Sequence, residues 1–96
     1  MQPDDTAKTD PHVTRRRNRM AGMWAAELLG LIGQAAQDYA HDLAHRHDGI
    51  PDDEPVARHL LADLKGKVSL HEIKDKLAHL VQEAKKQLHH EGDKGK

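Results

Sequence analysis

The sequence predicts an all-α fold, a four-helix bundle with a disordered N-terminal arm, from its composition and from the spacing of its apolar residues. Aromatic residues make up 2% of the chain and leucine and alanine dominate its apolar content, which favours packed helices over sheets. Apolar residues recur at the period of one helical face. Because 96 residues suit one small domain, we expect a disordered arm over residues 1–10, the bundle over 11–90 and a frayed tail over 91–96.

The first helix is predicted from a capping signal and an apolar stripe. Asp10 precedes a proline, the order of an N-cap residue followed by the first helical position. Met20, Trp24 and Leu28 then follow at helical spacing, and the helix is expected to end near Leu31. Because Trp24 is the largest apolar side chain available, and truncation of such a residue in a core costs about 3 to 5 kcal/mol, we expect it to anchor the fold.

A second, short helix is expected after a glycine. Gly33 can end one helix or cap the next, and small apolar residues then form a narrow stripe that includes Tyr39. The stripe ends near His45, where a turn-rich segment over residues 47–53 begins. The narrow stripe predicts close packing against a neighbouring helix.

The third helix is bounded by acidic residues before it and a glycine after it. Asp52 or Asp53 can cap its start, and a glutamate and a proline follow in its first turn. Leu61 and Leu64 belong to its expected buried face, and Gly66 is expected to stop it.

The fourth helix carries the strongest local signal in the chain. Ser69 and Glu72 form a Ser-x-x-Glu capping box at its start. Apolar residues then follow at alternating spacings of three and four, and this expected core face includes Ile73, Leu77 and Leu80. We expect the helix to run to about His89.

Composition also excludes several classes of function. The chain has no cysteine, which excludes disulfides, thiolate metal sites and a cysteine nucleophile. It has no run of 18 apolar residues and no basic-then-apolar start, so we expect neither membrane insertion nor a secretory signal. A net charge of −1 gives no overall attraction to nucleic acid. No nucleophile with a base and no phosphate loop is found, so we expect no enzyme activity and no cofactor.

A dense cationic cluster at residues 15–19 is the best candidate for contact with a partner. Guanidinium groups pair with carboxylates in a fork geometry and steer association, which favours an acidic protein groove over the solvated helix start that is the alternative. Nucleic acid is less favoured because no aromatic residues are interleaved with the arginines. The predicted partner-binding residues are Val13, Thr14, Arg15, Arg16, Arg17, Asn18 and Arg19.

Nine histidines in a short chain raise two further hypotheses. His41 and His45 share a helical face with Asp38, which makes a surface metal site conceivable, although such pairs are usually solvated and we expect no metal. Imidazole titrates near neutral pH, so a second hypothesis is acid sensing. In this hypothesis, charging of four histidines opposes close packing or assembly: His41, His45, His47 and His59. The alternative is a solubilising polar surface.

The sequence also resembles a known family. The stretch from Arg16 to Ala26 reads Arg-Arg-Asn-Arg-Met-Ala-Gly-Met-Trp-Ala-Ala, and the segments 33–40, 61–64 and 71–77 follow it in the family order. Together these residues resemble the zeta subunit family of alphaproteobacterial F-type ATP synthases, small inhibitors of ATP hydrolysis.

The resemblance implies that an N-terminal segment enters the catalytic head between its alpha and beta subunits and blocks rotation of the gamma subunit in the hydrolytic direction. It also implies a cytoplasmic protein held at the inner membrane through the synthase. Here fifteen residues precede Arg16 and the chain has no phenylalanine. In the family that it resembles, typical members carry a longer arm before this motif, and that arm contains phenylalanines. This difference favours weak inhibition. The alternative functions are a helical adaptor that retains the fold, or a histidine-based acid or metal sensor.

Overall fold

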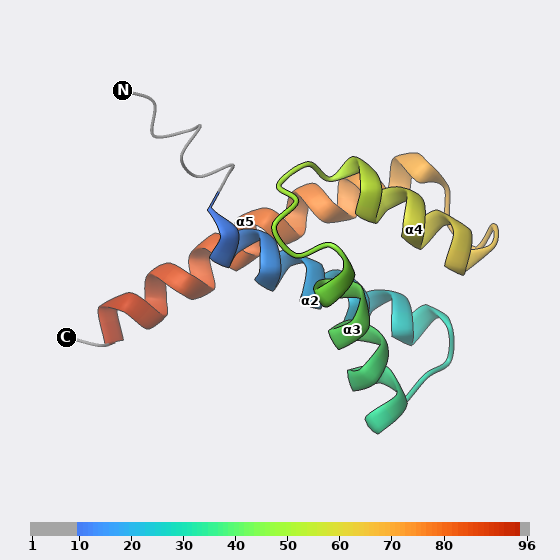
Figure 1. The fold of residues 1–96 in the computed structure, drawn as a ribbon, viewed down its shortest axis with the longest axis horizontal. Helices are drawn as coiled ribbons and strands as arrows, with labels where there is room; N and C mark the ends of the chain where they lie inside the picture. Colours follow the sequence, from blue (N-terminus) through green and yellow to red (C-terminus); the bar gives the residue numbers. More distant parts are fainter. Residues whose placement is uncertain (1–9, 95–96) are drawn as a thin grey trace.

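The computed structural model describes residues 10–94 of the chain, and this part is all-α (Figure 1). The helices are α2 (Pro11–Leu28), α3 (Gln34–Arg46), α4 (Glu54–Leu64) and α5 (Leu70–Lys94). The predicted four-helix fold is therefore confirmed. Residues 1–9 of the predicted arm lie outside the described residues.

Helix α2 holds the bundle together. It contacts α3, α4 and α5, and α4 also packs against α5. In Figure 1, α5 spans much of the length of the molecule and α2 crosses it. Helix α3 packs against α2, and α4 lies beside the first half of α5. The other helices are therefore arranged around α2.

The local capping signals at the starts of α2 and α5 are confirmed. The Asp10 carboxylate accepts a hydrogen bond from the backbone N–H of His12 at 2.9 Å. At the start of α5, the Glu72 N–H donates to Ser69 Oγ at 3.1 Å, and the Ser69 N–H donates to Glu72 Oε1 at 2.8 Å. Both arrangements satisfy backbone donors that the first helical turn leaves unpaired.

Helix α4 begins and ends near the predicted residues. Asp53 is its N-cap residue, but its side chain makes no capping bond, and the Glu54 N–H donates instead to Asp52 Oδ1 at 3.3 Å. After Leu64 the chain turns through Lys65 and Gly66, with φ values of 45° and 87°. This left-handed pair ends the helix and turns the chain toward α5.

Helix α5 continues beyond its expected end. Its backbone is helical to Lys94, whereas the prediction placed the end near His89 and a frayed tail from residue 91. A single glycine in a helix costs only about 1 kcal/mol, so Gly92 is a weak stop signal.

The core lies where α4 and α5 meet α2 and α3. Its residues are at most 1% exposed, and they are Ala21, Ala25, Leu43, Val56, Ala57, Leu60, Leu64, Ile73 and Leu77. Larger side chains close its edges and are only partly buried: Trp24, Leu29, Tyr39, Leu61, Val68, Leu70 and Leu80. Removing this apolar surface from water is the main favourable contribution to folding.

The structure corrects the expected core face of α2. Leu28 is 38% exposed, and Met20 is half-buried and lies outside the core cluster. Trp24 covers an edge of the core rather than its centre, and Lys76 Nζ lies 5.8 Å from the centre of its ring. The physical reason is that a helix with three neighbours must present small side chains to them, and alanine supplies that face.

The closest approach of α2 and α3 depends on a glycine. A Cβ atom on Gly22 would lie 2.6 Å from Ala40 Cα and 3.0 Å from Ala40 Cβ. The first distance is shorter than real Cβ contacts allow, and the atom that would have to move is backbone. Only glycine at this position therefore permits the observed packing.

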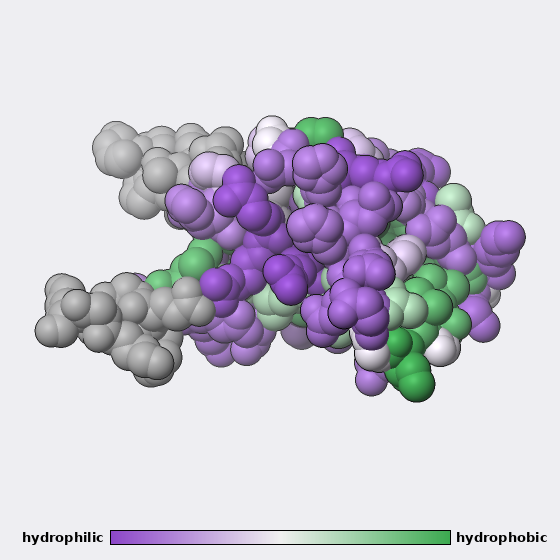
Figure 2. All heavy atoms as spheres, turned by 60° about the horizontal axis from the view of Figure 1, so that its bottom comes forward, coloured by the Kyte–Doolittle hydropathy of each residue, from purple (hydrophilic) through white to green (hydrophobic). Residues whose placement is uncertain are grey.

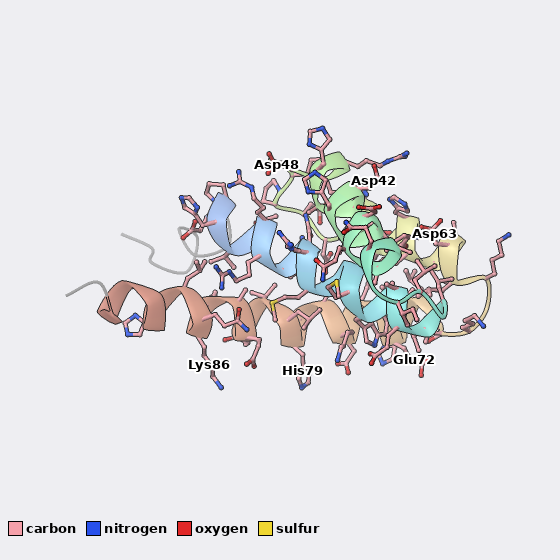
Figure 3. The ribbon with its side chains drawn as sticks, turned by 90° about the horizontal axis from the view of Figure 1, so that it is seen from below. Asp42, Asp48, Asp63, Glu72, His79 and Lys86 are labelled. Atoms are coloured by element: carbon pink, nitrogen blue, oxygen red, sulfur yellow. The ribbon has the colours of Figure 1, made fainter. Side chains whose placement is uncertain are left out.

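We predict that Gly22→Ala destabilises the fold. Helix propensity alone favours alanine over glycine by about 0.5 to 1 kcal/mol, but overpacking a close contact costs about 1 to 3 kcal/mol. Chemical denaturation followed by circular dichroism should show a lower free energy of unfolding. His79→Ala is the control, because His79 is exposed and points away from the bundle (Figure 3). A stabilised Gly22→Ala variant would contradict the packing.

Candidate partner-binding site

The helical period divides the predicted partner-binding residues into two faces of α2. The buried ones are Val13 (7% exposed), Thr14 (6%), Arg17 (3%) and Asn18 (0%). Of the others, Arg15 and Arg19 are exposed and Arg16 is partly exposed. The four buried side chains pack within the bundle, so in this arrangement Arg15 and Arg19 are the members of the predicted set that face outward.

Arg17 and Asn18 form a buried polar contact within the bundle. Arg17 Nε donates to Asn18 Oδ1 at 2.9 Å. Burial lowers the pKa of the Arg17 guanidinium, and the negative charges of Asp53 and Asp52 oppose this effect. These two residues therefore place a positive charge inside the bundle and link α2 electrostatically to the start of α4.

The arginines on the outward face of α2 make contacts at the surface of the bundle. Arg15 Nε lies 3.0 Å from Asp48 Oδ1, and both side chains are about half-exposed. Figure 3 shows Asp48 beside the first turns of α2. Arg16 Nη1 donates to Gln87 Oε1 at 3.0 Å. Exposed pairs of this kind are worth about 0 to 1 kcal/mol, so the Asp48 contact is easily exchanged for a partner's carboxylate.

A chain of polar groups crosses from α3 to α4. Tyr39 Oη donates to Asp63 Oδ2 at 2.6 Å, and His59 Nε2 lies 3.1 Å from the same oxygen. His59 Nδ1 in turn lies 2.9 Å from His47 Nε2. The position of Asp63 one turn after His59 could have indicated their pairing, but no sequence signal joins either residue to Tyr39 or His47.

Two groups in this chain have shifted pKa values. Burial, followed by the hydrogen bond to Asp63, raises the pKa of the Tyr39 hydroxyl. Burial also lowers the pKa of His47, and the nearby positive groups His59, Arg46 and Arg17 lower it further. The folded protein therefore favours neutral His47.

The histidines considered for metal binding do not form a ligand set. The rings of His41 and His45 stack with their centres 6.4 Å apart. Within residues 10–89, whose side chains the structure describes, no group of three or more histidine or acidic residues is placed to hold a metal ion.

We predict that Asn18→Ala destabilises the bundle by about 1.5 to 3 kcal/mol, the usual worth of a hydrogen bond to a charged group. The matched control is Gln37→Ala, which removes another amide acceptor, 3.5 Å from the exposed Arg19 Nη2. Its effect should be below about 0.5 kcal/mol. Denaturant unfolding measures both values, and equal effects would show that Asn18 has no special role.

Acid is predicted to destabilise the protein through His47. The folded pKa of His47 lies below its ordinary value of 6.5, so the unfolded chain binds the extra proton more readily. Stability from this group is complete above pH 6.5 and declines as the pH falls toward the folded pKa. Unfolding should be measured between about pH 5 and 8 for the natural chain and for His47→Gln, whose amide can still donate to His59. Parallel pH profiles would contradict the prediction.

Comparison with known proteins identifies the family. None of the helices described in residues 10–94 is long and apolar enough to cross a membrane. Neither a curated protein nor a solved structure matches the chain. The sequence model of the family described as ATPase inhibitor subunit zeta matches residues 6–87, which include α2, α3, α4 and most of α5. The chain therefore belongs to the ATPase inhibitor subunit zeta family.

Proposed function

We propose that this chain is a regulatory subunit that binds the catalytic head of the F-type ATP synthase and restrains ATP hydrolysis. The family match is the observation that carries the proposal. The outward arginines of α2 support it, because Arg15 and Arg19 are exposed on the helix that follows the N-terminal segment in the sequence. Guanidinium groups on such a surface suit carboxylates of a protein partner.

The proposed inhibition is mechanical. Residues before Asp10 insert between the alpha and beta subunits of the head and obstruct rotation of the gamma subunit, while the bundle holds them in place. Buried Arg17 and Asn18 support this role by fixing the orientation of α2 relative to the rest of the bundle. We expect weak inhibition, because residues 1–9 contain few large apolar side chains and such anchors dominate interface energies.

The same proposal assigns no catalytic role to the chain. The Ser69 hydroxyl is engaged at the start of α5, where it accepts a hydrogen bond from the Glu72 N–H. We place the protein in the cytoplasm, held at the inner membrane through the synthase.

Acid sensing is a second candidate function, favoured by the contact between His47 and His59 at 2.9 Å. Protonation of His47 would add a positive charge beside Arg46 and Arg17 and disturb the contact between His47 and His59, which joins the end of α3 to α4. This function would act together with inhibition rather than replace it.

We predict that the full chain lowers the ATP hydrolysis rate of the matching catalytic head, and that a variant lacking residues 1–9 binds but inhibits less. The truncated variant retains Asp10 and its capping bond, so its bundle should fold. Phosphate release measures the rate, and circular dichroism checks the fold. Binding of the full chain without any slowing of hydrolysis would favour the adaptor alternative. Absence of binding to the catalytic head would contradict both the inhibitory and the adaptor role on the synthase.

A further inference from the structure

A groove lies on the surface between α2 and the C-terminal half of α5, with a volume of about 510 Å³. Its lining residues are His12, Arg15, Arg16, Arg19, Met20, Met23, Gln87 and Leu88. Among these residues are three arginines and no carboxylate. The groove therefore combines positive charge with an apolar surface.

A histidine and two arginines follow one edge of the groove. His12, Arg15 and Arg19 are spaced three and four residues apart, so they lie along one side of α2 over about 10 Å. Arg16, also on α2, reaches α5, where Gln87 Oε1 accepts a hydrogen bond from its Nη1 at 3.0 Å. A row of this length matches about two helical turns of a partner.

The apolar part of the groove comes from both helices. Met20 and Leu88 are half-buried and Met23 is 36% exposed. Methionine is unbranched and adapts to irregular surfaces, which suits a docking site. The exposure of Met23 and Leu28 also shows that α2 directs large apolar side chains outward while alanines occupy its core face.

These features together restrict the chemistry of the occupant. A nucleic acid backbone would use the arginines but leave the methionines and Leu88 uncovered. The chain's net charge of −1 also provides no general attraction to a polyanion. An acidic amphipathic helix uses both parts, since its carboxylates can pair with the arginines while its apolar face covers the methionines.

We infer that this groove between α2 and α5 binds an acidic amphipathic helix of the ATP synthase catalytic head. The inference rests on the proposed function and adds the surface and the chemistry of the segment it receives. The partner helix places carboxylates one turn apart opposite Arg15 and Arg19, with apolar residues over Met20, Met23 and Leu88. Arg15 would then exchange its exposed contact with Asp48 for a carboxylate of the partner.

The test uses one glutamine-to-glutamate change inside the groove and one outside it. Gln87→Glu places a negative charge beside Arg16, where it competes with and repels an acidic partner. Gln82→Glu makes the same change at an exposed position of α5 that does not line the groove. Titration of each full-length variant against the catalytic head should show Kd weakened at least about tenfold for Gln87→Glu and unchanged for Gln82→Glu.

A second pair of variants removes positive charge. Arg19→Gln should weaken binding, whereas Arg46→Gln, at an exposed arginine on α3 that pairs with Asp42, should not. Equal binding by the groove variants and their controls would overturn the inference while leaving the proposed function intact. Absence of binding by the natural chain would instead overturn the proposed function and the inference with it.

A photo-crosslinking residue in place of Met23 identifies the occupant without depending on weakened binding. In the presence of the catalytic head, it should capture a peptide rich in aspartate and glutamate with apolar residues at helical spacing. Capture of nucleic acid, a second copy of this chain, or a peptide without acidic residues would overturn the inference.

Discussion

The close approach of α2 and α3 at Gly22 and Ala40 is the constraint on which the rest of the bundle depends. Because no side chain separates the backbones there, α2 can lie near α3 and still contact α4 and α5. Its buried face is accordingly built from small residues, including Ala21 and Ala25. The large apolar residues of α2 are displaced to its sides, where Trp24 closes an edge of the core and Leu28 is exposed.

The same constraint determines how the cationic cluster is used. Once the alanine and glycine face is turned inward, the helical period also carries Arg17 and Asn18 inward and leaves Arg15 and Arg19 outside. The buried pair costs desolvation, and the Arg17 guanidinium nitrogen Nη2 and the Asn18 amide nitrogen have no hydrogen-bond partner among the residues that the structure describes. Removing Asn18 alone is costly because it leaves the buried Arg17 charge without its partner, whereas the intact pair is better explained as fixing the orientation of α2 than as a large net gain in stability. Figure 2 shows that the visible face is largely hydrophilic, with an apolar area over the turn after α2, where Ile32 is 83% exposed.

Much of the fold could be predicted because its signals are local. The N-cap at Asp10 and the capping box at Ser69 and Glu72 depend on residues within one turn, and the apolar period of α5 identifies Ile73 and Leu77, which are fully buried. The core-facing side of α2 was harder to predict. The size of Trp24 suggested that it lies at the centre of the core, but the number of helices packed against α2 decides which side chains fit there. The contact between His47 and His59 depends on how the loop after α3 returns to α4, and no spacing in the sequence encodes that path.

The central claim is that α2 and α3 touch backbone to backbone. Nuclear magnetic resonance of the isotope-labelled protein tests it most directly, through the nuclear Overhauser effect between the Hα protons of Gly22 and the Hα and methyl protons of Ala40. The distances of 2.6 and 3.0 Å from the Cβ position of Gly22 to Ala40 Cα and Cβ predict strong cross-peaks. Absence of these cross-peaks in the folded protein would show that the helices are separated, and the arrangement of the arginines derived from their packing would be contradicted.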